Sequence, residues 1–178
     1  MLDTKRGGTS VLNKLFAHNT WANLKLLDYC EGLSAAQLDT TAIGGFGSIR
    51  DTLVHIIGAE VSYVYRVNGR LPTTSFSKGQ FPGFEVLKDT VRWTGDELLQ
   101  LAFSTQQDTT VREHEKRLYV EYTLASLMVQ AVSHSIEHRT QIATIITQLG
   151  PVPPDMSGWK YMEETGELQE GEEGAEAA

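Results

Sequence analysis

The chain has 178 residues, of which 40% are hydrophobic and 21% are charged, the composition of one soluble globular domain with a sizeable core. It has 15 Lys and Arg against 23 Asp and Glu, so its formal net charge of -8 and the lack of a basic cluster argue against nucleic-acid binding. The single cysteine, Cys30, excludes an intramolecular disulfide, and no apolar run approaches the ~18 residues that cross a bilayer. Since the N-terminus MLDTKRGGTS lacks the apolar stretch of a signal peptide, we expect a cytoplasmic protein with no membrane partner.

The negative charge is concentrated at the C-terminal end. Residues 161–178 contain seven glutamates and no Lys or Arg, which leaves 16 acids against 15 bases in residues 1–160. The sequence TGELQEGEEGAEAA contains one leucine, too little apolar area to offset the entropy of ordering the segment. We therefore expect a nearly neutral single domain at 1–160, followed by an acidic, disordered tail at 161–178.

Four segments have the apolar spacing of amphipathic helices, at residues 10–31, 48–68, 85–104 and 123–149. Ser10 and Ser48 are suitable N-caps, and SAAQ at 34–37 has the capping-box pattern of a single helical turn. Residues 109–122 are rich in β-branched and aromatic residues and predict a small hairpin or extended excursion before the last helix. The connection at 71–83 is long for a bundle and is a candidate border of a site. The pattern predicts an all-α fold, a four-helix bundle.

His134 and His138 are the clearest candidates for metal ligands. Their i, i+4 spacing places both imidazoles on one face of the last helix, one turn apart. His138 lies near the centre of the apolar stripe, and burying an imidazole without a partner costs roughly 1–3 kcal/mol. A bound metal would supply partners for both, but side chains or water would satisfy them too, so the spacing alone leaves both interpretations open.

A third ligand must come from another helix, and His55 is the best candidate. On a helical wheel it lies opposite Leu53 and Ile57, on the side that carries the small or polar residues Ala59 and Ser62. A metal cavity could open on that side, or the side could be plain surface, and the spacing favours neither.

The remaining candidates are weaker. His18 is a less favoured ligand in the first helix, and His114 lies in a charged segment where we expect it to be solvated. Glu60 is about 140° around the helix from His55, so we do not expect the two to share a metal. Cys30 is expected to be a small buried hydrophobic residue.

Three separated motifs resemble those of the DinB/YfiT-like family. They are HNTWANLKLL at 18–27, SIRDTLVHII at 48–57, and HSIEHRTQIA at 134–143 with its exit QLG at 148–150 and Pro153-Pro154. The resemblance covers residues 10–160, and the order and spacing of the three motifs make it far more specific than the histidine pair alone. One departure is His18, where the family often has tyrosine.

The resemblance implies a four-helix bundle of up-down-down-up order. It also implies a divalent metal, commonly nickel or zinc, held by His55, His134 and His138. Family members are often homodimers, and characterised relatives include thiol-dependent transferases and isomerases that use mycothiol, bacillithiol or glutathione.

We therefore expect a metal-dependent enzyme, a thiol-dependent transferase or a hydrolase that acts on a small molecule, with a low-molecular-weight thiol as a possible co-substrate. Three neutral imidazoles leave the charge of a divalent ion uncompensated and a coordination position open for water or a thiolate. The candidate general bases are Glu60, Glu137 and His18.

The alternative is a non-enzymatic, stress-associated bundle that binds a metal or a partner. A fourth protein ligand, such as His18 or Glu60, would close the coordination sphere and favour that alternative. Apolar residues on the flanks of the first two long helices suggest a second buried surface and hence a homodimer, unless loops cover them; they are Trp21, Tyr29, Val54, Val61 and Tyr65.

Overall fold

The four amphipathic segments form four long helices in the computed structural model, which describes residues 10–74, 80–103, 108–115 and 118–168. The long helices are α1 (Val11–Glu31), α3 (Ile49–Asn68), α4 (Phe84–Phe103) and α5 (Leu124–Gln148). The short elements are α2 (Ala35–Leu38), α6 (Gly158–Glu164) and the strands β1 (Thr110–Glu115) and β2 (Leu118–Thr123). The sequence predicted the four long helices and α2 to within a residue or two at each end, and it predicted a hairpin or extended excursion where β1 and β2 lie. It did not predict α6.

Side-chain N-caps mark the starts of these helices at the positions that the sequence predicted. The hydroxyls of Ser10, Ser48 and Thr123 each accept a hydrogen bond from the backbone N–H three residues on, at the starts of α1, α3 and α5. Ser34 and Gln37 form the predicted capping box of α2. Gly69 ends α3 with a left-handed φ of 69°, a conformation that glycine adopts without strain.

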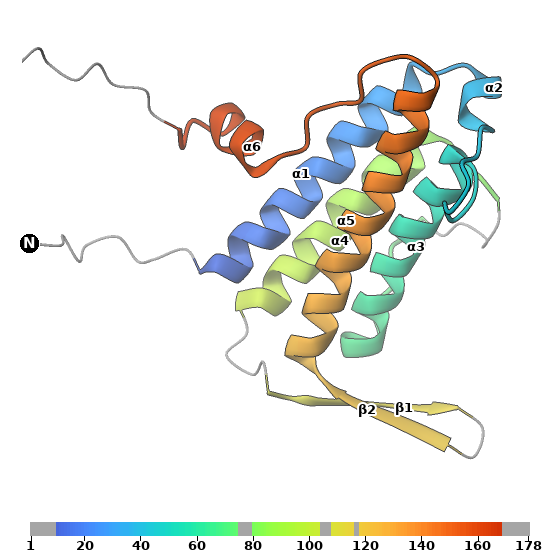
Figure 1. The fold of residues 1–178 in the computed structure, drawn as a ribbon. Coiled ribbons are helices and arrows are strands. Elements are labelled where there is room, and N and C mark those ends of the chain that lie inside the picture. Colours follow the sequence, from blue (N-terminus) through green and yellow to red (C-terminus); the bar gives the residue numbers. More distant parts are fainter. Residues whose placement is uncertain (1–9, 75–79, 104–107, 116–117, 169–178) are drawn as a thin grey trace, which may run out of the picture.

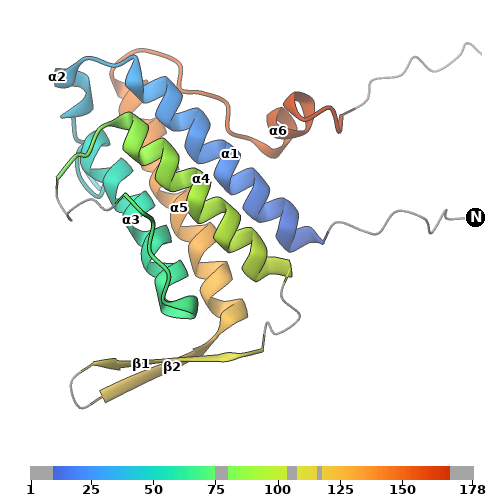
Figure 2. The same ribbon diagram turned by 180° about the vertical axis from the view of Figure 1, so that it is seen from behind.

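The long helices form the predicted bundle with up-down-down-up order (Figures 1 and 2). α1 packs against α4 and α5, and α3 packs against the same two helices on the opposite side. α3 and α4 run in the same direction, so the chain between them returns along the length of the bundle. Nowhere in the described ranges is there a helix of the length and apolar character needed to cross a bilayer.

The antiparallel hairpin of β1 and β2 caps one end of the bundle (Figure 1). Its Glu113 accepts a hydrogen bond from Arg66 of α3 at 2.6 Å, and another from the hydroxyl of Tyr122. A charged contact therefore holds the hairpin against the end of α3. The hairpin is also joined to α5, because β2 leads directly into that helix.

The core consists of two apolar clusters with a polar layer between them. One cluster lies towards α2 and includes Leu26, Ile49 and Ile145, and the other lies towards the hairpin and includes Phe16 and Leu127. All four long helices contribute to the polar layer, whose side chains are at most 4% exposed. Its members are Asn19, Asn23, Glu60, Thr94, Ser135 and Arg139.

Hydrogen bonds connect all six members of this polar layer. Oε1 of Glu60 accepts from Nδ2 of Asn19 at 2.7 Å, Nδ2 of Asn23 at 2.8 Å and Oγ of Ser135 at 3.0 Å. Oε2 of Glu60 accepts from Oγ1 of Thr94 at 2.9 Å. The two asparagines in turn accept from Nη1 of Arg139, at 2.7 and 2.6 Å. Burial lowers the pKa of the Arg139 guanidinium to about 10, against the opposing effect of the Glu60 carboxylate, so it stays charged at neutral pH.

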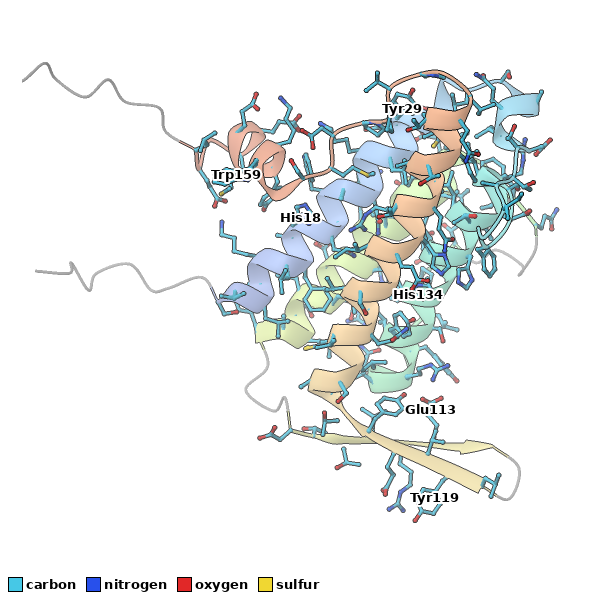
Figure 3. All side chains as sticks on the ribbon, viewed as in Figure 1. His18, Tyr29, Glu113, Tyr119, His134 and Trp159 are labelled. Atoms are coloured by element: carbon cyan, nitrogen blue, oxygen red, sulfur yellow. The ribbon has the colours of Figure 1, made fainter. Side chains whose placement is uncertain are left out.

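Helix α6 extends across residue 161, where we expected the tail to begin. It continues past residue 160 to Glu164 and lies along α1 (Figures 1 and 3). Trp21 donates from Nε1 to Glu164 at 3.0 Å, Lys25 pairs with Glu164, and Lys14 pairs with Glu167. Glu164 and Glu167 of the acidic segment are thus partners of lysines on α1, and the count of charges along the sequence did not reveal this. Residues 169–178 of the expected tail lie outside the described residues.

The contacts between α6 and α1 cover part of the apolar surface that the sequence suggested for a homodimer. The indole of Trp21 packs against the Tyr161 ring of α6, with ring centroids 5.4 Å apart, so it is covered by this chain's own C-terminal segment. Val54 is buried, whereas Tyr65 is exposed on α3. Homodimer formation stays a prediction.

Gly95 of α4 marks a close approach of α4 to α1. A Cβ built at this position would lie 2.7 Å from Cγ2 of Thr20, whose hydroxyl is bonded to the Phe16 carbonyl oxygen. We predict that Gly95→Ala lowers the free energy of unfolding by about 1–3 kcal/mol, because overpacking outweighs the gain of about 1 kcal/mol in helix propensity. Urea denaturation checks this. Thr20→Ala in the same chain should restore much of the loss, and an unchanged loss in the double variant would contradict the steric cause.

His18 connects α1 to the segment before α6. Its Nε2–H donates to the Met156 carbonyl oxygen at 2.9 Å, and its ring packs against Trp21 and Tyr161. Burial, and to a lesser degree the charge of Arg139, lower the pKa of His18 below its ordinary 6.5, although the bond to Met156 raises it.

A histidine with a lowered pKa makes the folded state acid-sensitive. The folded state binds this proton less readily than the unfolded chain, so stability is steady above pH 6.5 and falls as the pH drops through the lowered pKa. We predict that His18→Tyr, which keeps an aromatic ring but cannot take up the proton, removes part of that fall. Urea denaturation from pH 7.5 to pH 5 measures it, and identical pH profiles for the two proteins would refute the prediction.

Candidate metal centre

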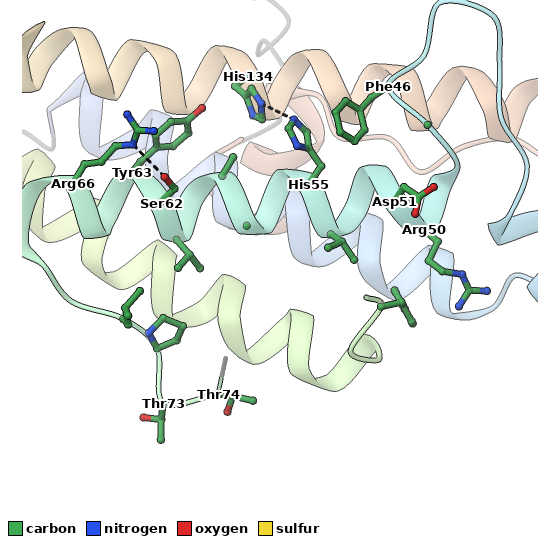
Figure 4. A pocket seen from close by; sticks show the side chains of 18 residues that line it. Phe46, Arg50, Asp51, His55, Ser62, Tyr63, Arg66, Thr73, Thr74 and His134 are labelled. Atoms are coloured by element: carbon green, nitrogen blue, oxygen red, sulfur yellow. Dashed lines mark hydrogen bonds between the residues drawn. The ribbon is translucent and has the colours of Figure 1, made fainter. Parts of the chain in front are cut away.

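His55 of α3 and His134 and His138 of α5 lie together on one side of the bundle. One potential ligand atom from each forms a set whose members lie within 4.8 Å of one another. Nε2 of His134 and Nε2 of His55 face each other at 3.0 Å (Figure 4). The structure therefore brings together all three histidines that the sequence proposed as metal ligands, and among the described residues it brings none of the other candidates into this set.

Local helix geometry explains this convergence. His134 and His138 are one turn apart, so they project from the same face of α5, and α5 packs directly against α3. His138 is 7% exposed, as its place near the centre of the apolar stripe predicted, and His134 is half-buried. His55 projects on the side of Ala59 and Ser62, and a cavity opens there.

The tautomer of His138 follows from its neighbour Gln141. Nδ1 of His138 lies 2.9 Å from Oε1 of Gln141, and this oxygen also accepts the backbone N–H of Phe46 at 3.1 Å. Because the backbone N–H of Phe46 can only donate, the atom that it meets is the amide oxygen. An amide oxygen can only accept, so Nδ1 of His138 carries the proton in this bond. In neutral His138 the lone pair is therefore on Nε2, the nitrogen left free to bind a metal.

The electrostatic environment favours an uncharged imidazole at His134. Burial lowers its pKa, the neighbouring His138 lowers it further, and Glu137 opposes the shift. A neutral imidazole is the form that binds a metal, so burial prepares this side chain as a ligand at neutral pH. Its Nδ1 is buried and has no hydrogen-bond partner among the described residues.

These residues fit a divalent metal ion. Two nitrogens bound to one tetrahedral zinc ion lie about 3.3 Å apart, since each Zn–N bond is about 2.0–2.1 Å. The 3.0 Å between the His55 and His134 nitrogens is close to that spacing. Three imidazoles suit zinc, nickel, copper and iron, so the donor set alone does not select the metal.

A cavity of about 1090 Å³ adjoins two of the three histidines. His55 and His134 line it, and Phe46 stacks on His55 with ring centroids 3.8 Å apart and an angle of 16° between the ring planes. The cavity continues along α3 past small residues to Tyr63 and Arg66 (Figure 4). Leu71, Pro72, Thr73, Thr74 and Phe81 contribute another wall, so the long connection after α3 does border the site as its length predicted.

The other candidate residues have different surroundings. His18 faces Met156 and α6, and the Glu60 carboxylate is occupied by four hydrogen bonds in the core, so neither belongs to the histidine set. Glu137 is exposed. Cys30 is buried as expected, and burial raises the pKa of its thiol to about 12, which makes it a poor nucleophile. The side chain of His114 lies outside the described residues.

Sequence reasoning assigned no role to two residues of the site. Gln141 stands three residues after His138, a spacing that places it within reach on the same helix. Phe46 lies in a glycine-rich loop before α3 and carries no sequence signal of its contact with His55, since only the fold brings the two rings together.

Comparisons with known proteins agree with this architecture. The DinB family model matches residues 1–173. A crystal structure of a DinB-like protein from Bacillus cereus ATCC 10987 is 15% identical, covers 81% of this chain and 94% of its own, and superposes with a TM-score of 0.60. At that identity the likeness establishes the fold alone. A comparison with curated protein sequences gives no match.

Proposed function

The chain belongs to the DinB family, and from this premise we propose that it is a metal-dependent enzyme in which His55, His134 and His138 hold one divalent ion. The observation that carries the proposal is the convergence of three imidazoles from two helices beside a large cavity. Zinc and nickel are the ions that we propose: the family resemblance implies them, and imidazole nitrogen is a good ligand for both.

The site has the features of a catalytic rather than a structural metal centre. Structural zinc sites are closed by four protein ligands, whereas catalytic sites use three and keep one position open. The two residues that could have closed the site, His18 and Glu60, are engaged elsewhere. This supports the enzymatic proposal over the non-enzymatic bundle.

A divalent ion in this position would act as a Lewis acid that lowers the pKa of a bound thiol or water. We therefore propose a thiol-dependent transferase or a hydrolase, with a low-molecular-weight thiol as co-substrate in the first case. None of the candidate general bases, Glu60, Glu137 and His18, belongs to the histidine set. This favours chemistry in which the nucleophile is already an anion when it reacts.

The cavity defines what kind of small molecule would fit. Its floor along α3 consists of small or apolar residues such as Val54, Gly58 and Ala59, and Phe46 and Phe81 add aromatic surface. Polar or charged side chains stand towards both ends of the cavity, Ser62 and Arg66 at one end and Arg50 and Asp51 at the other (Figure 4). An elongated molecule with an apolar middle and polar ends matches this lining.

We predict that protein purified without chelators or a histidine tag contains about one zinc or nickel ion per chain. His138→Ala and His55→Ala should each lower the content well below that level, because the remaining two imidazoles bind weakly. Elemental analysis measures this. The matched control is His18→Gln, which removes a histidine outside the site and should keep the metal. Less than about 0.2 ion per chain in the wild type, or full content in His138→Ala, would overturn the proposal.

The same protein loaded with cobalt distinguishes an enzyme site from a structural one. Small thiols should change the visible spectrum of the cobalt protein, since a thiolate can enter an open coordination position. A spectrum that stays the same with every thiol tested would favour the closed, structural alternative.

A further inference from the structure

Gln141 joins a proposed metal ligand to the loop between α2 and α3. Its Oε1 accepts the Nδ1–H of His138 at 2.9 Å and the backbone N–H of Phe46 at 3.1 Å. One oxygen thus connects α5, where His134 and His138 lie, with the loop that precedes α3, where His55 lies. The proposed function uses neither bond.

The loop that carries Phe46 has few constraints of its own. Its glycines are Gly44, with a left-handed φ of 82°, Gly45 and Gly47. The ends of the loop are held by pairing of Thr41 with Ser48, and its interior by a bond from the Gly45 N–H to the Ala42 carbonyl oxygen. The placement of Phe46 therefore depends strongly on the bond to Gln141 and on ring stacking.

Phe46 covers the proposed metal centre. Its ring stacks on His55 at 3.8 Å and meets His138 edge-on at 5.4 Å between centroids, while 51% of the residue remains exposed. It also lines the cavity (Figure 4). Movement of this ring would change access to His55 from the cavity.

We propose that Gln141 is a positioning residue that couples occupancy of the metal centre to closure of the Phe46 loop. The inference rests on the proposed metal site. With Nε2 of His138 bound to an ion, the proton must remain on Nδ1, so this nitrogen always donates to Gln141. Gln141 then keeps its oxygen directed at both donors and holds the Phe46 ring over His55.

In the metal-free protein this constraint is absent. Neutral His138 can also carry its proton on Nε2, and its Nδ1 then presents a lone pair towards Oε1 of Gln141. Two acceptors repel each other, so while His138 holds this tautomer Gln141 turns away and the Phe46 amide loses its partner; in the other tautomer both bonds remain. The loop is consequently freer before the ion binds than after it, which leaves a route to His55 open for the ion and then closes it.

Amide hydrogen exchange of Phe46, followed by NMR, tests the coupling. We expect exchange at this amide to slow by about fivefold or more when one equivalent of Zn²⁺ is added, the effect of securing one hydrogen bond. Exposed amides elsewhere should not change. Equal exchange rates with and without bound Zn²⁺ would overturn the coupling.

Variants of Gln141 separate positioning from mere packing. Gln141→Met has a similar shape without the oxygen, and should lose the protection of the Phe46 amide and weaken Zn²⁺ binding by about 10–100-fold. Gln141→Glu keeps an acceptor for both donors and should retain the protection. The matched control is Gln148→Met on the exposed end of α5, which should leave both quantities unchanged.

Failure of this inference and failure of the proposed function are distinguishable. If wild-type protein binds no Zn²⁺, the proposed function fails. The bond from Gln141 to Phe46 is tested separately in metal-free protein, where Gln141→Met should still speed exchange at Phe46 relative to wild type. If Gln141→Met binds Zn²⁺ as tightly as wild type, gives the same cobalt spectrum and keeps the Phe46 amide protected, Gln141 has no positioning role.

Discussion

Four helices converge on one buried carboxylate, that of Glu60. Asn19 and Asn23 of α1, Thr94 of α4 and Ser135 of α5 donate to it, and Arg139 of α5 balances its charge through the two asparagines. Removing one partner from a buried ion pair is strongly destabilising, because it leaves a charge without compensation. Apolar side chains above and below this layer can exchange neighbours, but these directed bonds are satisfied in one alignment of the four helices.

That alignment determines the geometry of the histidine site. On α5, the residues of the polar layer alternate with the proposed ligands: Ser135 follows His134, and Arg139 follows His138. On α3, Glu60 lies five residues after His55, so the two project on different sides of the same helix. The polar layer in the core therefore sets how α3 is rotated about its axis and shifted along it relative to α5. The three imidazoles meet outside this layer, on the side of the two helices that faces the cavity. Helices held this firmly provide the rigid support that a metal site requires.

Much of the fold could be predicted from local signals. The N-caps Ser10 and Ser48 and the apolar spacing between them and the helix ends are properties of short segments, and they located α1 and α3 closely. Helix α6 was missed because it is short and is stabilised by contacts with α1, such as the bond from Trp21 to Glu164, that no local pattern contains. The polar layer was missed for a related reason, since a helical wheel cannot show that Asn19, Glu60 and Arg139 meet.

The candidate site was predictable to a similar extent. The spacing of His134 and His138 identified two of the three histidines in the set. For His55, a helical wheel left open whether the side chain faces a cavity or the surface, and only the packing of α3 against α5 decides it. Gln141 and Phe46 depend on tertiary contacts between distant segments.

The most direct test of the metal centre is a crystal structure of the protein grown with zinc or nickel, with anomalous scattering measured at the absorption edge of the metal. We expect one ion about 2.0–2.1 Å from a nitrogen of each of His55, His134 and His138, with its remaining coordination positions held by water or a small molecule. An ion bound elsewhere, or a fourth ligand from the protein that closes the site, would contradict it.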